Sequence, residues 1–266
     1  MSRAFLETHL RTQPKDALAW ALGAAIEFYD VVIDWMIGGA EITPGKLLRG
    51  KKLQIGDDKS GRILQFAGKA EEFARGLVSD PATEDMGYFA LSISSGVRRD
   101  YEALVLGHWK ASLAHAQETN LLGRKLLKAN PKAHDAYCIF GWSEYLISRV
   151  PAPVRRLARI PGITGNRARA IQFCEVPVKS GQYYREFAMC LLVALYSEEG
   201  KTAEAVGVLT DLARAYPTNT AVAAELTRRS TGEKSPAGDK AGDKRETDYG
   251  QKNRKEKTGA RKRSVA

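Results

Sequence analysis

Apolar residues recur at three- and four-residue intervals along most of this chain, which is the period of an amphipathic α-helix. The clearest case is 17–37, and Gly38-Gly39 is expected to end that helix. The same period predicts helices over 62–78, 83–96, 98–119, 121–128, 132–148, 166–175, 183–199, 202–216 and 221–229. Strand-like alternation is scarce, and residues 40–61 are irregular. The pattern therefore predicts an all-α fold.

Some features repeat at a fixed interval. Leu106-Gly107 and Phe140-Gly141 are 34 residues apart, which is the length of one tetratricopeptide repeat. Asn130-Pro131 precedes the predicted helix pair of 132–148 and 166–175, at the place where the closing proline of the preceding repeat would stand. We therefore expect a solenoid of antiparallel helix pairs.

Residues 191–219, LLVALYSEEGKTAEAVGVLTDLARAYPTN, resemble a tetratricopeptide unit. In that alignment Tyr196 is the aromatic residue of the first helix, Gly200 the tight turn and Ala205 the small residue of the second helix. Small residues let the two helices approach closely, and Pro217 ends the second one.

Residues 72–228 as a whole resemble a bacterial family of divergent tetratricopeptide proteins. The matching residues are Asp135, Ala136, Tyr137 and Gly141, then Gly165, Asn166 and Arg167. Asn166 replaces the family's aspartate, but asparagine also serves as an N-cap. The resemblance implies a helical-repeat domain over 1–228. It implies no role, because most members of the family have no defined function.

The net charge of +10 is unevenly distributed over the 266 residues. Residues 229–266 hold 12 basic and 6 acidic residues and few apolar ones, so this tail is expected to be disordered. It is either a solubilising segment or a loose contact for an anionic surface.

The chain has three cysteines, Cys138, Cys174 and Cys190, and they form no C-x-x-C motif. They are expected to be reduced core residues.

The apolar segments are too short or too interrupted for a transmembrane helix, and the N-terminus lacks the apolar core of a secretion signal. The chain as given is therefore expected to be cytoplasmic. An export signal upstream of Met1 would escape this test.

No catalytic motif is present: the chain has no Walker A, GxGxxG, GxSxG or HExxH sequence. His134 and Cys138 are four residues apart and could supply two metal ligands, but a zinc site needs more. The acidic stripe of Glu27, Asp30 and Asp34 is expected to be a solvated helix face. We expect neither enzymatic activity nor a cofactor.

Residues 149–169, RVPAPVRRLARIPGITGNRAR, lengthen one connection between helices and contain six arginines and no acid. Guanidinium groups bind carboxylates and phosphates bidentately, so an acidic peptide, a phospholipid or a nucleic acid could dock there. The alternative is that these arginines pair with acidic side chains of neighbouring helices. The candidate residues are Arg149, Arg155, Arg156, Arg159, Arg167 and Arg169.

Part of this segment, PGITGNRARAI, also resembles the helix-hairpin-helix element, which grips DNA phosphates. Its glycines are separated by two residues where that motif has one, which changes the turn.

Tetratricopeptide arrays bind an extended segment along the concave groove of their first helices. The repeat positions project Tyr101, Leu104, His108, Asp135, Cys138, Trp142 and Tyr145 onto that groove. The chaperone-tail clamp of some tetratricopeptide proteins needs lysine and asparagine at these positions, where this chain has Leu104, His108, Cys138 and Trp142. We therefore expect an apolar ligand face rather than such a clamp. Alternatively, these aromatic residues are simply core.

Two functions follow from these patterns. The first is a non-enzymatic scaffold or adaptor that binds a partner segment in the groove. The second is a binder of nucleic acid or anionic membrane through the arginine-rich insert and the basic tail. Phosphate contacts weaken steeply with ionic strength, whereas apolar contacts weaken much less.

Overall fold

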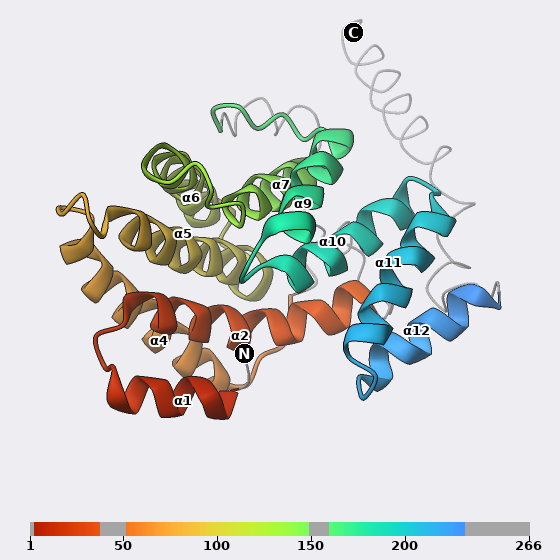
Figure 1. Cartoon of the computed structure of the whole chain (residues 1–266), viewed down its shortest axis with the longest axis horizontal. Coiled ribbons are helices and arrows are strands. Elements are labelled where there is room, and N and C mark those ends of the chain that lie inside the picture. The colour runs from red at the N-terminus through yellow and green to blue at the C-terminus, as the bar shows by residue number, and fades with distance from the viewer. Residues whose placement is uncertain (1–2, 38–51, 149–159, 232–266) are drawn as a thin grey trace, which may run out of the picture.

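The computed structural model describes residues 3–37, 52–148 and 160–231 (Figure 1). These ranges contain ten α-helices and one π-helical turn, η1, and no strand, so the predicted all-α class is confirmed. The elements are α1 (Arg3–Thr12), α2 (Ala17–Ile37), α4 (Asp57–Leu77), α5 (Glu84–Tyr101), η1 (Glu102–Leu106), α6 (Trp109–Ala129), α7 (Ala136–Ser148), α9 (Arg167–Ser180), α10 (Arg185–Glu198), α11 (Thr202–Ala215) and α12 (Thr220–Ser230).

Helices that follow one another along the chain pack side by side. The closest pairs are α2 with α4, α5 with α6, α7 with α9, and α10 with α11. One buried apolar cluster runs through all of them, from Ala17 in α2 to Val222 in α12. The helices therefore share a single core.

Helix α2 has neighbours from both ends of the chain. It runs across the middle of the molecule in Figure 1 and packs on α4 and α5, and it also contacts α10 and α12. Its sequence accounts for this placement, because apolar residues cover most of its circumference. In a simple solenoid each repeat touches its immediate neighbours, so the contacts of α2 with α10 and α12 close the array on itself.

The boundaries of the middle helices differ from the predicted ones. We predicted breaks near 97 and 120, but α5 runs on to Tyr101 and α6 is continuous from Trp109 to Ala129. The break lies at Gly107, which has φ 75° and ends η1 in the left-handed region that favours glycine. Helix α1 was not predicted.

The predicted equivalence of Gly107 and Gly141 is wrong. Gly107 lies between two helices, whereas Gly141 lies inside α7 and packs against Cys174 of α9. Their 34-residue spacing therefore does not relate like positions of a repeat.

None of the helices in the described ranges is long and apolar enough to cross a membrane.

The last described helix, α12, continues to Ser230, two residues beyond the predicted domain boundary at 228. The tail from 232 onward lies outside the described residues.

Candidate functional site

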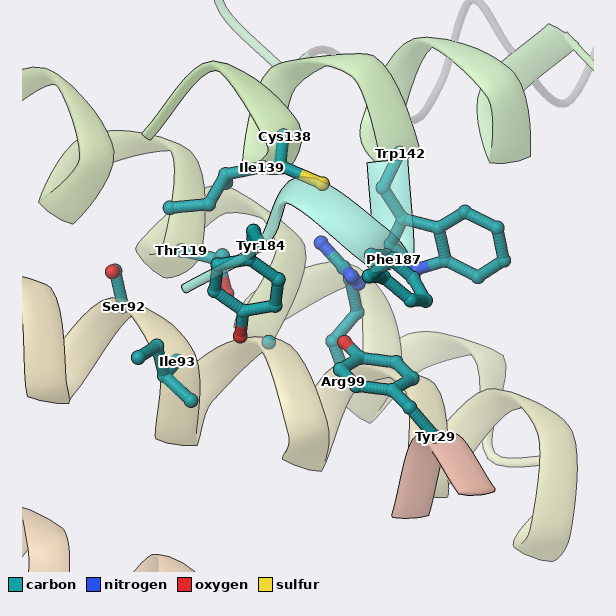
Figure 2. A pocket seen from close by; sticks show the side chains of 11 residues that line it. Tyr29, Ser92, Ile93, Arg99, Thr119, Cys138, Ile139, Trp142, Tyr184 and Phe187 are labelled. Atoms are coloured by element: carbon teal, nitrogen blue, oxygen red, sulfur yellow. The ribbon is translucent and has the colours of Figure 1, made fainter. Parts of the chain in front are cut away.

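A small pocket lies where α2, α5, α6, α7 and α10 meet (Figure 2), and its empty space of about 280 Å³ includes open solvent at its mouth. A water molecule can occupy only a small part of this space, with room for about one. Aromatic side chains make up four of its eleven lining residues, and the rest are a mixture of polar, aliphatic and small residues: Tyr29, Ser92, Ile93, Gly96, Arg99, Thr119, Cys138, Ile139, Trp142, Tyr184 and Phe187.

A buried ion pair borders this cavity. Arg99 and Asp100 are adjacent in α5 and are 3% and 0% exposed. Arg99 donates from Nε to Oδ1 of Asp100 at 2.7 Å and from Nη2 to Oδ2 at 2.9 Å. Oδ2 also accepts from the Tyr29 hydroxyl at 3.0 Å and from the Trp142 indole at 2.7 Å. The carboxylate thus joins α2, α5 and α7.

Small residues of α5 let α6 approach this site closely. The Ser95 hydroxyl donates to the backbone carbonyl of His115 at 3.2 Å, and Thr119 donates to Ser95 Oγ at 3.0 Å. Asn120 donates to Ser143 Oγ at 3.0 Å, and Arg99 reaches the same oxygen at 3.4 Å. The polar network therefore extends across α5, α6 and α7.

Burial and the Asp100 charge control protonation here. Burial lowers the pKa of Arg99, but the charge and hydrogen bonds of Asp100 outweigh it, so the pKa is raised and the guanidinium stays charged. Burial, followed by the Asp100 charge, raises the pKa of Tyr29 well above its usual value. Burial also raises the pKa of Tyr184 and of Cys138.

This chemistry suits a structural site better than a reactive one. Both tyrosines and the Cys138 thiol are protonated at neutral pH, so none of them is an activated nucleophile. Arg99 has five N–H donors, and its hydrogen bonds to Asp100 and Ser143 use three of them.

Most of the residues predicted to line a groove are buried. Tyr101, Leu104, Cys138, Trp142 and Tyr145 belong to the main core. In this conformation they contact other helices and are closed to a partner, which is the alternative reading of these aromatics.

The other two predicted groove residues lie apart from each other. Asp135 is buried, and its carboxylate accepts hydrogen bonds from the backbone N–H groups of Gln182, Tyr183 and Tyr184 at 2.9, 3.1 and 2.8 Å. It anchors the start of α10. His108 is exposed, with Nδ1 2.9 Å from Glu102 Oε2.

Two of the predicted anion-binding arginines are paired within the protein. Arg167 Nη1 lies 3.1 Å from Glu199 Oε1, and Arg169 Nη1 lies 3.1 Å from Oε1 of the buried Glu144. These contacts match the alternative in which the arginines pair with neighbouring acids. Arg149, Arg155, Arg156 and Arg159 lie outside the described residues.

Backbone amides of the loop before α9 bind the carboxylate of Glu144. Its Oε2 accepts from the N–H groups of Thr164 and Asn166 at 3.1 and 2.8 Å. The Asn166 side chain caps α9 by accepting from Arg169 N at 3.1 Å, as its predicted N-cap role requires. Gly162 and Gly165, both at φ 74°, form the turns of this loop.

The weaker candidates for chemistry have structural partners. Glu27 is buried and pairs with Arg3 at 3.0 Å and with Arg62 at 3.3 Å. Asp30 pairs with Arg3 and Lys59, and the side chain of Asp34 is outside the described residues. In the described part of the chain, no three His, Cys, Asp or Glu residues lie close enough to hold a metal ion.

Periodicity and motif spacing did not predict the Arg99–Asp100 pair. A signal was available: Asp100 falls on the apolar stripe of Phe89, Ile93, Val97 and Leu104, at helical spacing. A carboxylate on an apolar stripe must be paired or hydrogen-bonded when the stripe is buried.

Comparison with known proteins adds no relative. No family model matches the chain, and neither a curated protein nor a solved structure does.

Proposed function

We propose that this chain is a non-enzymatic scaffold that holds a partner segment on the surface of a rigid helical array. The observation that carries this proposal is the buried network around Arg99 and Asp100, which ties three helices together through one carboxylate. A rigid surface favours binding, because only the partner then loses conformational freedom.

We further propose that α10 and α11 form a tetratricopeptide-type pair. In support, Gly200 lies in the turn between the helices at φ 70°, and Ala205 is fully buried. Pro217 follows the end of α11. The contacts of α2 with α10 mean that any such repeats would sit in a closed array.

The burial of most predicted groove residues supports a binding surface outside that groove. Because most of them are core, a partner segment would bind to the outer faces of the helices in this conformation. The ion pairs of Arg167 and Arg169 also favour a scaffold over the anion-binding alternative, because those charges are already balanced.

A pull-down with the full chain at about 50 and 300 mM salt tests this function, because phosphate contacts fade over that range. We expect the same protein partner at both salt concentrations. The Asp100→Asn variant, with a weakened core and an unchanged tail, should lose it. The proposal would be contradicted if only nucleic acid or lipid were recovered, at low salt, in equal amounts by the parent chain and by the Asp100→Asn variant.

A further inference from the structure

Helix α1 folds back along α2 at one edge of the molecule (Figure 1). Its two buried side chains, Leu6 and Leu10, form a small cluster with Ala19 of α2, distinct from the main core. Leu6 lies over Gly23 of α2, where a Cβ would be 3.0 Å from Leu6 Cδ2 and 2.6 Å from Phe66 Cδ2. We call the surface formed by Ala19, Gly23 and Phe66 the α1 notch.

The acids that bind α1 keep other partners when α1 leaves. Arg3 of α1 pairs with Glu27 and with Asp30 of α2, each at 3.0 Å. Helix α4 supplies a second cation to each acid, because Arg62 lies 3.3 Å from Glu27 and Lys59 lies 3.1 Å from Asp30. Glu27 is buried, and an unpaired buried charge is costly. Release of α1 therefore leaves this buried acid with a counter-charge.

The hinge that joins α1 to α2 spans residues 13–16, and its first three residues are exposed. Pro14 pushes the residue before it toward extended backbone, which is the conformation that an open hinge needs. The contacts that close the hinge are near the surface: the Trp20 indole donates to the Pro14 carbonyl at 2.8 Å, and His9 Nε2 lies 2.8 Å from Asp16 Oδ2. The hinge can therefore open without disturbing the core.

An open hinge exposes the apolar α1 notch to water, so another segment must cover it. The segment that matches the notch in both shape and charge is α1 itself, through Leu6, Leu10 and Arg3. We propose that two copies of this chain exchange α1, so that each α1 fills the α1 notch of the other copy. Every contact between α1 and the notch recurs across the two copies, which makes such an exchange a low-cost route to a dimer. This inference goes beyond the scaffold function and adds a second copy as a partner.

Exchange between copies competes with closure within one chain. A short linker gives the segment that it carries an effective concentration in the millimolar range. The full chain should therefore be monomeric at micromolar concentration and form dimers as it is concentrated toward about 1 mM. Size-exclusion chromatography with light scattering measures the mass at each concentration.

A shortened hinge should make the exchange obligatory. Deletion of residues 13–15 leaves only Asp16 between the helices, whereas a helical hairpin needs a loop of about 2–5 residues. This variant should have the mass of two chains at micromolar concentration. The matched control inserts a flexible Gly/Ser segment between Pro14 and Lys15. It should stay monomeric there, because α1 can still fold back onto its own chain.

A mixing experiment in the shortened chain identifies the surfaces that make the dimer. Leu6→Asp/Leu10→Asp spoils α1 but keeps the notch, whereas Gly23→Leu fills the notch but keeps α1. Each variant should be monomeric alone, and an equimolar mixture of the two should form a dimer. Gly23→Ala replaces Gly23→Leu if circular dichroism shows that the leucine variant is unfolded. The control Thr8→Asp/Arg11→Asp places two aspartates on the exposed face of α1 and should leave the dimer intact.

Several results would overturn the exchange. They are a full chain that stays monomeric up to about 1 mM, a folded shortened chain that is monomeric, and a dimer that survives Leu6→Asp/Leu10→Asp. A foreign protein captured by Leu6→Asp/Leu10→Asp but not by the parent chain would assign the α1 notch to that protein instead of a second copy. If the pull-down partner persists at high salt in these cases, the scaffold function stands and only the exchange is wrong.

Discussion

At the scale of single residues, buried carboxylates act as joints between helices. Asp100 joins α2, α5 and α7 through Tyr29 and Trp142. Asp135 and Glu144 do the same for α10 and α9 by accepting backbone N–H groups. A buried carboxylate is tolerated where charge-assisted hydrogen bonds satisfy it, so these acids fix how the helices are oriented.

The Asp100→Asn substitution should be strongly destabilising. It leaves the Arg99 guanidinium buried without a counter-charge, which costs about 3–5 kcal/mol of unfolding free energy. Urea unfolding of the full chain measures this loss. The exposed pair of Arg214 with Asp211 provides the control, because Asp211→Asn should cost less than about 1 kcal/mol.

A double substitution separates pairing from packing. Arg99→Met/Asp100→Leu should be less destabilising than Asp100→Asn, because it removes both charges together. A double variant that loses more stability than the single one would show that the network matters for its shape rather than for its charges.

Stability should fall at alkaline pH because of the three cysteines. Burial raises the pKa of all three thiols, and that of Cys190 to about 12. In the unfolded chain a thiol ionises near pH 8.5, so above that pH the unfolded state binds fewer protons and is favoured. The contribution of Cys190 is fully present below about pH 8.5 and is lost as the pH rises toward 12.

Urea unfolding at pH 8, 9 and 10 measures this effect. The drop between pH 8 and 10 should be smaller in Cys190→Ala than in the parent chain, by up to about 2 kcal/mol. Identical slopes for the two chains would show that this thiol ionises equally in both states.

At the scale of helices, periodicity predicted most elements, and glycine placement decided the errors. The predicted 17–37 helix has the observed bounds of α2, because its apolar pattern is continuous and Gly38-Gly39 follows it. The sequence pattern predicts a helix end at Gly96, but Gly96 lies inside α5, where a Cβ would make only ordinary van der Waals contact with Thr119. Helix α1 was not predicted, although its buried residues Leu6 and Leu10 are four apart, at helical spacing.

The contact between α7 and α9 depends on Gly141. A Cβ there would lie 2.5 Å from Cys174 Sγ and 3.2 Å from the carbonyl oxygen of Ala170. Gly141→Ala should therefore destabilise the chain by about 1–3 kcal/mol, measured by thermal or urea unfolding. Adding Cys174→Ala should recover part of the loss.

Gly207 in α11 is the matched control, because a Cβ there meets nothing within 4 Å. Gly207→Ala should stabilise by about 0.5–1 kcal/mol, since alanine favours the helix. Equal effects at the two glycines would refute the role of close packing at Gly141.

At the scale of the whole molecule, the first and last thirds of the chain depend on each other. The ring centroids of Tyr29 in α2 and Phe187 in α10 lie 4.4 Å apart. Phe187 also packs on Trp142 at 5.7 Å. This aromatic cluster joins α2 to α10, a contact that a simple solenoid of helix pairs would not make.

Phe187→Ala should loosen both ends of the chain together. Its cost should be about 3–5 kcal/mol, and hydrogen exchange should speed up in α2 as well as in α10. Leu6→Ala in the separate cluster of α1 should raise exchange mainly in α1. If Phe187→Ala changed exchange only near α10, the two ends would be independent.

The candidate site could not be assembled from the sequence, because its residues are far apart in the chain. The Tyr29 hydroxyl meets a carboxylate 71 residues away, and the Trp142 indole meets the same group from 42 residues away. Helical period assigns faces but not neighbours. The groove residues were projected on the assumption that each repeat contacts only its neighbours, but most of them lie in the core that the helices share.

The closure has a consequence for synthesis on the ribosome. One side of α2 is covered by α10, whose Phe187 is translated roughly 150 residues after α2 is complete. At about 5–20 residues per second, that apolar side waits for about 8–30 seconds. During this interval the nascent chain exposes an apolar helix surface. A chaperone that covers this surface until α10 emerges would raise the yield of folded protein.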